Sequence, residues 1–385
     1  MSRQLWIFAL AISLIWSVPV FAQCKASLGT DFQGNICSGT INGTFYETRT
    51  GKWINEDDGT FEGTATFSKS IAVTAVKKTG KVFNSYFEGA LDYGQQIDST
   101  GKVYVFQMIT GREKLADGIF TGEKTIEIRL DGQQIRKVGE LITANFEGSI
   151  GYVEFKDTTG KTIVFQKLTG REKLADGVFI GDKTIEVLPD GQRVRKTGKL
   201  LTADFEGSID SGESKDVSGK LNSYQKLTGR EKLADGVFIG DKIIETRPDG
   251  QLIRKTGKLL TADFEGSIDS GESKDVSGKV NSYQKLTGRE KLADGYFEGD
   301  KIIEIRPDGQ LIRKTGKLLT AEFQGTLDYG ESKSNTTLTN TFEKKNGTWL
   351  VSPTLKLQGD ITINVTPAGV QVIDKRKQVA GNITN

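Results

Sequence analysis

The 385-residue sequence contains no histidine. Histidine is the side chain used most often as a general base and as a metal ligand, so its absence excludes Ser–His and Cys–His nucleophile systems. A glycosidase needs only two carboxylates, and carboxylates are abundant in this sequence, so this mechanism remains open. We expect no cofactor and no metal centre, and we treat a carboxylate-dependent carbohydrate enzyme only as an alternative function.

Cysteine and proline are also scarce, with two and six residues respectively. Both cysteines, Cys24 and Cys37, lie close to the N-terminus. In an oxidising compartment such a pair is expected to form a disulfide, which would fix the first strands of the fold. A two-thiolate metal site is the alternative, but the sequence has no histidine and no third soft ligand to complete it.

Long apolar runs are missing after the N-terminus. Arg3 precedes the apolar run Leu5–Val20, and Val20-Phe21-Ala22 offers a cleavage point after Ala22, which predicts a signal peptide over residues 1–22. We therefore expect export to the periplasm, the cell surface or the extracellular space. The net charge of +2 predicts no general attraction to nucleic acid.

Glycine, in contrast, is abundant, with 46 residues. Many of these glycines recur at a fixed spacing, and Gly111, Gly170, Gly229 and Gly288 form one such series. A fixed period, here about 59 residues, predicts a repeat array rather than several globular domains. We divide the mature chain into an N-terminal cap (23–57), tandem repeats (58–330) and a C-terminal β cap or tail (331–385).

The local pattern within a period is that of β-strands. Apolar and polar residues alternate over Leu200–Asp210 and Val178–Leu188, and Lys220–Leu227 is expected to form a third strand. The segment Leu188-Pro189-Asp190-Gly191-Gln192 is typical of a tight turn, and Leu174–Gly177 and Asp216–Lys220 are weaker turn signals. The predicted fold class is all-β: an elongated array of antiparallel β-hairpin repeats with irregular caps at both ends.

The recurring Phe-x-Gly-x-(Ile/Leu)-x-x-Gly, as in Phe205-Glu206-Gly207-Ser208-Ile209-Asp210-Ser211-Gly212, resembles the first half of a MORN (membrane occupation and recognition nexus) repeat. The likeness covers about residues 58–330, although these units are longer than usual and carry Phe in place of Tyr. The resemblance implies successive antiparallel hairpins in a scaffold or surface-associated protein with no catalytic residues. The repeated structural positions are Phe87, Phe146, Phe205, Phe264 and Phe323, with Gly89, Gly148, Gly207, Gly266 and Gly325.

A recurring basic run is the main candidate binding feature. An arrayed cationic stripe would bind a polyanion by multivalency, whereas the alternative is a solvated edge strand whose charges prevent aggregation. The stripe consists of Arg193, Arg195 and Lys196 with their counterparts Arg254, Lys255, Arg313 and Lys314.

Three further features are weaker candidates. The candidate aromatic residues for stacking on sugars are Tyr224, Tyr283, Trp53 and Trp349. The segment Asp210–Asp216 is expected to be a solvated turn, with a Ca²⁺ site as the alternative. Conspicuous carboxylates such as Glu147, Glu206 and Glu265 recur, which argues against a single active site.

The expected function is therefore that of an exported, non-enzymatic, multivalent binding or scaffold module. Its expected partners are a polysaccharide, an envelope lipid or a repetitive surface protein. The alternative is a structural spacer that presents the segment 331–385.

Overall fold

The computed structural model describes residues 23–56, 59–334, 339–352 and 355–379. These residues form β-strands and turns and no helix, so within them no helix could cross a membrane. The predicted signal peptide, residues 1–22, lies outside the described residues. The chain divides into two compact units, residues 1–143 with 151–161, and residues 144–150 with 162–385.

The described residues of the first unit form strands β1 to β9, and each of these strands pairs antiparallel with the next one along the chain. They are β1 (Gln23–Leu28), β2 (Phe32–Ile41), β3 (Thr44–Glu56), β4 (Gly59–Lys69), β5 (Val73–Phe83), β6 (Phe87–Asp98), β7 (Val103–Lys114), β8 (Gly118–Arg129) and β9 (Gly132–Thr143). Strand β10 (Phe146–Asp157) is divided between the two units.

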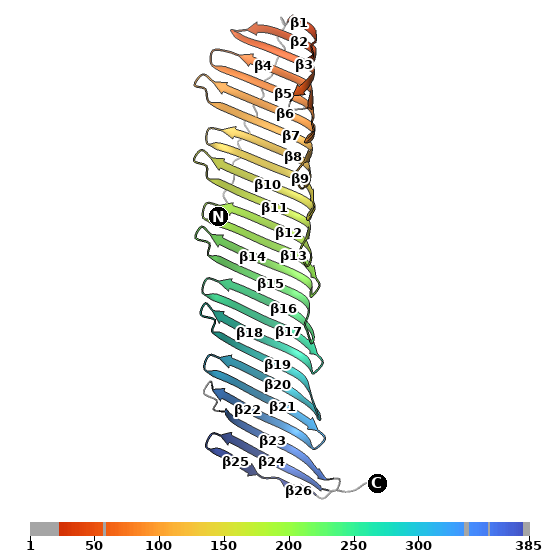
Figure 1. Ribbon diagram of the computed structural model, residues 1–385, viewed down its shortest axis with the longest axis vertical. Coiled ribbons are helices and arrows are strands. Elements are labelled where there is room, and N and C mark those ends of the chain that lie inside the picture. The colour runs from red at the N-terminus through yellow and green to blue at the C-terminus, as the bar shows by residue number, and fades with distance from the viewer. Residues whose placement is uncertain (1–22, 57–58, 335–338, 353–354, 380–385) are drawn as a thin grey trace, which may run out of the picture. The chain divides into compact units, whose positions relative to one another are not determined.

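The second unit continues the same hairpin order, with neighbouring strands joined by turns at alternate ends (Figure 1). Its first eight strands are β11 (Thr162–Lys173), β12 (Gly177–Leu188), β13 (Gly191–Thr202), β14 (Phe205–Asp216), β15 (Leu221–Lys232), β16 (Gly236–Arg247), β17 (Gly250–Thr261) and β18 (Phe264–Asp275). The others are β19 (Val280–Leu292), β20 (Gly295–Arg306), β21 (Gly309–Thr320), β22 (Phe323–Ser334), β23 (Thr339–Ser352), β24 (Leu355–Thr366), β25 (Gly369–Asp374) and β26 (Lys377–Val379). The predicted all-β class built from antiparallel hairpins is confirmed.

Each sequence period contains four strands rather than the three expected from the alternation pattern. The prediction of one strand over Leu200–Asp210 is wrong, because the chain reverses between β13 and β14. The hydroxyl of Thr202 accepts a hydrogen bond from the Phe205 amide at 3.0 Å and closes this turn. The turn contains neither glycine nor proline, so the usual sequence signal for a reversal is absent.

The three turns that were predicted are confirmed. Leu188 and Gly191 flank the tight turn between β12 and β13, with Gly191 at φ 142°. The β11–β12 turn is closed by a hydrogen bond from the Leu174 amide to the Gly177 carbonyl. In the β14–β15 turn the Asp216 carboxylate accepts hydrogen bonds from the Ser218 and Lys220 amides, both at 2.9 Å.

The apolar residues gather on one face of the paired strands, which we call the Phe face. Phe179 is only 2% exposed and lies in a cluster with Ile209 and Leu227, and the half-buried residues packed against them are Leu174, Leu200 and Phe205. The cluster recurs around Phe238 and Phe297. Because opposed residues of an antiparallel pair lie on the same face, the register also places Gly181 and Gly198 on the Phe face.

Glycine pairs permit the rings to lie flat on this face. A Cβ atom added to Gly181 would lie 3.1 Å from Cζ of Phe179, two residues earlier on the same strand. It would also lie 2.3 Å from the carbonyl oxygen of Thr197 on the next strand. Gly181 therefore accommodates the ring of Phe179 on its own strand.

The flanks of the repeats are more regular than expected. Strand β3 starts one full period before β7, and β23 starts one full period after β19, so the strand pattern extends beyond residues 58–330. In each of the two units a tryptophan packs against phenylalanine rings of its own strands. Trp53 lies 4.6 Å from Phe32 and 5.0 Å from Phe61, and Trp349 lies 4.7 Å from Phe323, measured between ring centroids.

The predicted disulfide is present. Cys24 on β1 is paired in register with Cys37 on β2, their Cα atoms are 4.0 Å apart, and the two sulfur atoms are bonded. Since β1 pairs only with β2 among the described strands, the bond holds a strand that has a single neighbour. A disulfide is most often found in exported proteins.

Candidate functional site

The basic run of each repeat alternates between the two faces of the sheet. In β13, Lys196 is in register with Lys183 and so lies on the Phe face, whereas Arg193 and Arg195 lie on the opposite face, which we call the Arg face. The same split separates Arg254 from Lys255 and Arg313 from Lys314. The seven residues predicted as one cationic stripe therefore do not share a surface.

The alternative interpretation as an edge strand is also wrong. Strand β13 pairs with β12 on one side and β14 on the other, and β17 and β21 are flanked in the same way. Their cations consequently do not protect an unpaired edge.

On the Phe face, each lysine of the run belongs to an ion cluster. Lys196 Nζ lies 3.0 Å from Glu172, which also pairs with Lys183 at 2.5 Å. The same ammonium lies 5.4 Å from the ring centroid of Phe179 and helps to cover it. The equivalent clusters contain Glu231 with Lys242 and Lys255, and Glu290 with Lys301 and Lys314.

Burial and pairing act in opposite directions on these glutamates. Desolvation alone would raise the pKa of Glu172, but hydrogen bonds from Lys183 and Lys196 outweigh it and hold the pKa below its ordinary value of 4.5. Glu231 and Glu290 behave identically. The three lysines predicted to bind a ligand are thus engaged in holding the sheet together.

These ion clusters predict that the fold is less stable at acidic pH. A carboxylate whose pKa is lower in the folded than in the unfolded chain contributes stability above about pH 4.5 that is lost as the pH falls through the folded pKa. In the Glu231→Gln variant we expect lower stability at pH 7 and a weaker dependence on pH below 4.5, measured by thermal unfolding between pH 3 and 7. Exposed Glu206, without an ion pair among the described residues, is the control, and Glu206→Gln should follow the wild-type curve. Coincident curves for all three proteins would contradict the prediction.

The Arg face carries a different arrangement, which follows one line across four strands. Arg195 on β13 is in register with Gly212 on β14, Gly212 with Tyr224 on β15, and Tyr224 with Glu245 on β16. We call this set of four the Arg–Tyr row. Opposed residues of antiparallel strands share a face. The cation, the glycine, the aromatic ring and the carboxylate therefore lie side by side in that order.

The row recurs at the same register in other repeats. The complete second copy is Arg254, Gly271, Tyr283 and Glu304. In the last copy the order is Arg313, Gly330, Phe342 and Asn364. In the first unit it is Lys77, Gly94, Phe106 and Glu127.

The cation and the aromatic ring of each row are open to solvent. Tyr224 and Tyr283 are each 37% exposed and Phe342 is 36% exposed. A Cβ added to Gly212 would meet nothing within 4 Å, in contrast to the glycines of the Phe face. Among the described residues, no carboxylate lies within ion-pair distance of the exposed Arg195. Glu245 is held by Arg247 at 2.8 Å.

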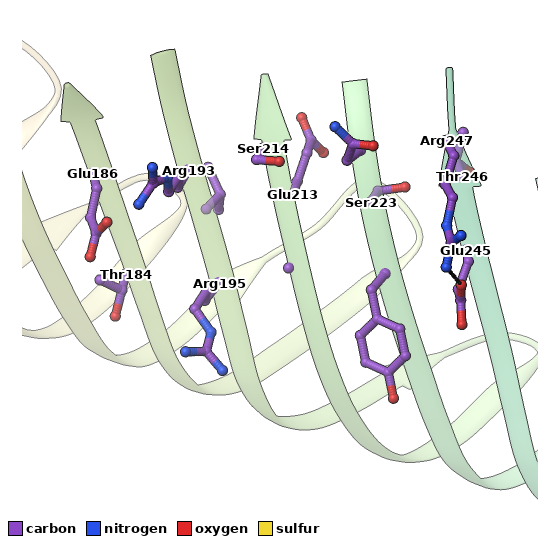
Figure 2. Close-up of a pocket in the computed structure, with 14 residues that line it drawn as sticks. Thr184, Glu186, Arg193, Arg195, Glu213, Ser214, Ser223, Glu245, Thr246 and Arg247 are labelled. Carbon is purple, nitrogen blue, oxygen red and sulfur yellow. Dashed lines mark hydrogen bonds and ion pairs between the residues drawn. The ribbon is translucent and has the colours of Figure 1, made fainter. Parts of the chain in front are cut away.

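A shallow hollow of about 750 Å³ covers this row. Its lining comes from β12 to β16 and includes Arg195, Gly212, Tyr224 and Glu245. Figure 2 shows Glu186, Arg193 and Arg195 on adjacent strands, with the ion pair between Glu245 and Arg247 at the far side. A second hollow of about 430 Å³ contains Tyr283 and Gly271 of the next row.

The other sequence candidates lie elsewhere. Trp53 and Trp349, expected as sugar platforms, are packed against phenylalanines on the Phe face, so that prediction is wrong. Residues 210–215 belong to strand β14 rather than to a turn, and only Asp216 enters the turn. No group of three or more His, Cys, Asp or Glu that could hold a metal occurs in the described part of the chain.

Sequence reasoning missed the row although a signal was present. Phe106, Phe165, Tyr224, Tyr283 and Phe342 follow one another at intervals of one period. The pattern is hard to see in the sequence because it mixes Phe with Tyr. Its last member, Phe342, also lies in the segment 331–385, which was expected not to repeat.

Comparisons of the chain with protein-family models, with curated proteins and with solved structures found no match to any of them.

Proposed function

We propose that this chain is a non-enzymatic, multivalent binding module that acts after export from the cytoplasm. The observation that carries the proposal is the Arg–Tyr row: an exposed aromatic ring and an exposed arginine recur in one register on one face. Equivalent rows are separated by four strands, or about 19 Å at the usual strand spacing. Weak sites at a fixed spacing bind a repetitive partner tightly because the second contact is intramolecular.

The carboxylates support a non-catalytic role. A glycosidase requires a carboxylic acid whose pKa is raised so that it can donate a proton. Where the described carboxylates depart from their ordinary pKa, as at Glu172, Asp182 and Asp216, the shift is downward. The causes are hydrogen bonds from lysines, threonines, serines and turn amides, which are structural contacts repeated along the array.

The MORN-like interpretation and the exported location belong to the same proposal. Antiparallel hairpins with a Phe-x-Gly at the start of β14, β18 and β22 agree with the resemblance. The predicted signal peptide and the Cys24–Cys37 disulfide agree with an oxidising, extracytoplasmic compartment. The spacer alternative has less support, because the segment 331–385 itself contributes Phe342 to the last row.

The test is a valency series in the full mature chain. We expect Tyr224→Ala and Tyr283→Ala each to weaken binding, and the triple variant with Phe342→Ala to lose about a hundredfold in apparent affinity, the range of avidity gains. The measurement is interferometry against immobilised dextran, a polyuronate, a sulfated polysaccharide and anionic phospholipid vesicles.

The matched control is the double variant Ile180→Ala, Ile239→Ala. Both isoleucines are exposed on the Arg face, at 43% and 42%, but lie outside the rows. This variant should bind as the wild type does. If the chain without its three aromatics bound its polymer at full strength, the proposal would be wrong, and a tail-presenting spacer would be favoured.

A further inference from the structure

We propose that the ligand of the Arg–Tyr rows is an acidic polysaccharide. This inference rests on the proposed function and specifies its chemistry: a sugar ring lies against the aromatic side chain, and a carboxylate or sulfate on the polymer pairs with the free arginine.

The arginine is the anion-binding group. Arg195, Arg254 and Arg313 are exposed on the Arg face and have no ion pair among the described residues, whereas Lys167 and Lys226 of the same face pair with Asp182 and Asp241 at 3.1 and 3.0 Å. A guanidinium presents paired N–H donors in a plane, which matches the oxygens of a carboxylate or sulfate.

The aromatic ring provides the apolar part of the site. Tyr224 stands two strands from Arg195, about 10 Å at the usual strand spacing. Gly212, which lies between them, has no side chain to occupy the space above the sheet. A ring with both an apolar face and a polar hydroxyl suits a ligand with C–H faces and hydroxyl groups. The hollow over these residues is shallow, and most of the residues that line it are polar or charged, as expected for the binding of a hydrated polymer.

The carboxylate beyond the ring is a hydrogen-bond acceptor for the ligand. Glu245 and Glu304 are held by Arg247 and Arg306, at 2.8 and 2.6 Å, and each faces the aromatic residue of its row. A carboxylate held in this way accepts hydrogen bonds from sugar hydroxyls, and the paired arginine balances its charge. The acidic group of the polymer is therefore expected at the other end of the row, where the arginine has no ion pair among the described residues.

The same alternation disfavours a uniformly anionic surface. In the rows of Arg195 and Arg254 a membrane of anionic lipid would meet a carboxylate as well as an arginine, and the net charge of +2 supplies little general attraction. A polymer with intermittent charges places anions only where the arginines lie. Equivalent arginines stand about 19 Å apart across four strands, so a chain crossing the strands contacts several rows.

The test compares two triple variants of the full mature chain. Arg195→Gln, Arg254→Gln, Arg313→Gln removes the row cations. Lys199→Gln, Lys258→Gln, Lys317→Gln removes the same charge from the same strands and face, at exposed lysines outside the rows. The probes are polygalacturonate and heparin, which separate carboxylate from sulfate recognition, with dextran and anionic phospholipid vesicles for comparison.

We expect the arginine variant to lose at least tenfold in affinity for one acidic polysaccharide, roughly the loss of one charge-assisted hydrogen bond or more. The lysine variant should lose less than about threefold, as general charge screening predicts. Equal losses in the two variants would overturn the inference. So would tight binding to dextran or vesicles that depends on the aromatics, although the proposed multivalent function would then survive. Failure of all four probes to bind would overturn both.

Discussion

Gly207→Ala is expected to be among the most damaging single substitutions in the chain. A methyl group at this position would lie 2.3 Å from the carbonyl oxygen of Thr228 and 2.7 Å from the Cα of Gly229, both backbone atoms of β15. The strands cannot make room without breaking their hydrogen bonds. We expect a loss of about 3 kcal/mol in the stability of this region, at the upper end of overpacking effects.

Hydrogen exchange followed by mass spectrometry measures that loss locally, which matters because a repeat array need not unfold as one unit. Peptides from β14 and β15 should exchange faster in the variant, while those from the equivalent β18 and β19 should not. Gly212→Ala is the control on the same strand, since a Cβ there meets nothing within 4 Å. Similar exchange in the two variants would show that the glycine pairs do not limit the approach of the strands.

Phe238→Ala is the second large effect. The Phe238 side chain is 2% exposed and packs in a cluster with Ile268 and Leu286, and its ring is also covered by Lys255, whose Nζ lies 5.5 Å from the ring centroid. Removal of a buried phenylalanine creates a cavity that the neighbouring strands fill only in part. We expect a loss of about 4 kcal/mol, within the range for such substitutions.

Tyr224→Ala is the matched control for Phe238→Ala because it removes an aromatic ring from the adjacent strand on the opposite face. Its side chain is 37% exposed, so its effect on stability should stay within about 0.5 kcal/mol. Exchange protection of β15, β16 and β17 measures both variants. Equal destabilisation would mean that the two faces contribute alike to stability, against the burial pattern.

The two variants also separate stability from binding. Phe238→Ala should weaken the fold and leave the neighbouring rows chemically intact, whereas Tyr224→Ala should weaken binding and leave the fold intact. This opposition follows from the alternation of side chains along a strand, which places structural and candidate binding residues on opposite faces.

The β character of the chain, its period of about 59 residues and three of its turns are evident in the sequence. Alternation along Val178–Leu188 predicted a strand that the structure contains as β12. Pro189, Asp190 and Gly191 marked their turn because each favours it by its own backbone or side-chain chemistry. The Cys24–Cys37 disulfide was also predictable, since the chain offers no other cysteine as a partner.

Which residues share a face across several strands depends on the pairing register, and the sequence pattern does not reveal that register. A shift of one residue in pairing exchanges the faces, and the reversal at Thr202–Phe205, made without glycine or proline, changes the parity of everything that follows it. Arg195 and Lys196 are neighbours in sequence, yet one is a free surface cation and the other is bound to Glu172. Arg195 and Tyr224 are distant in sequence, yet they belong to one row because β13, β14 and β15 pair in that register. Sequence periodicity specifies the repeating unit, whereas hydrogen-bonded register, a property of pairs of strands, assembles the site.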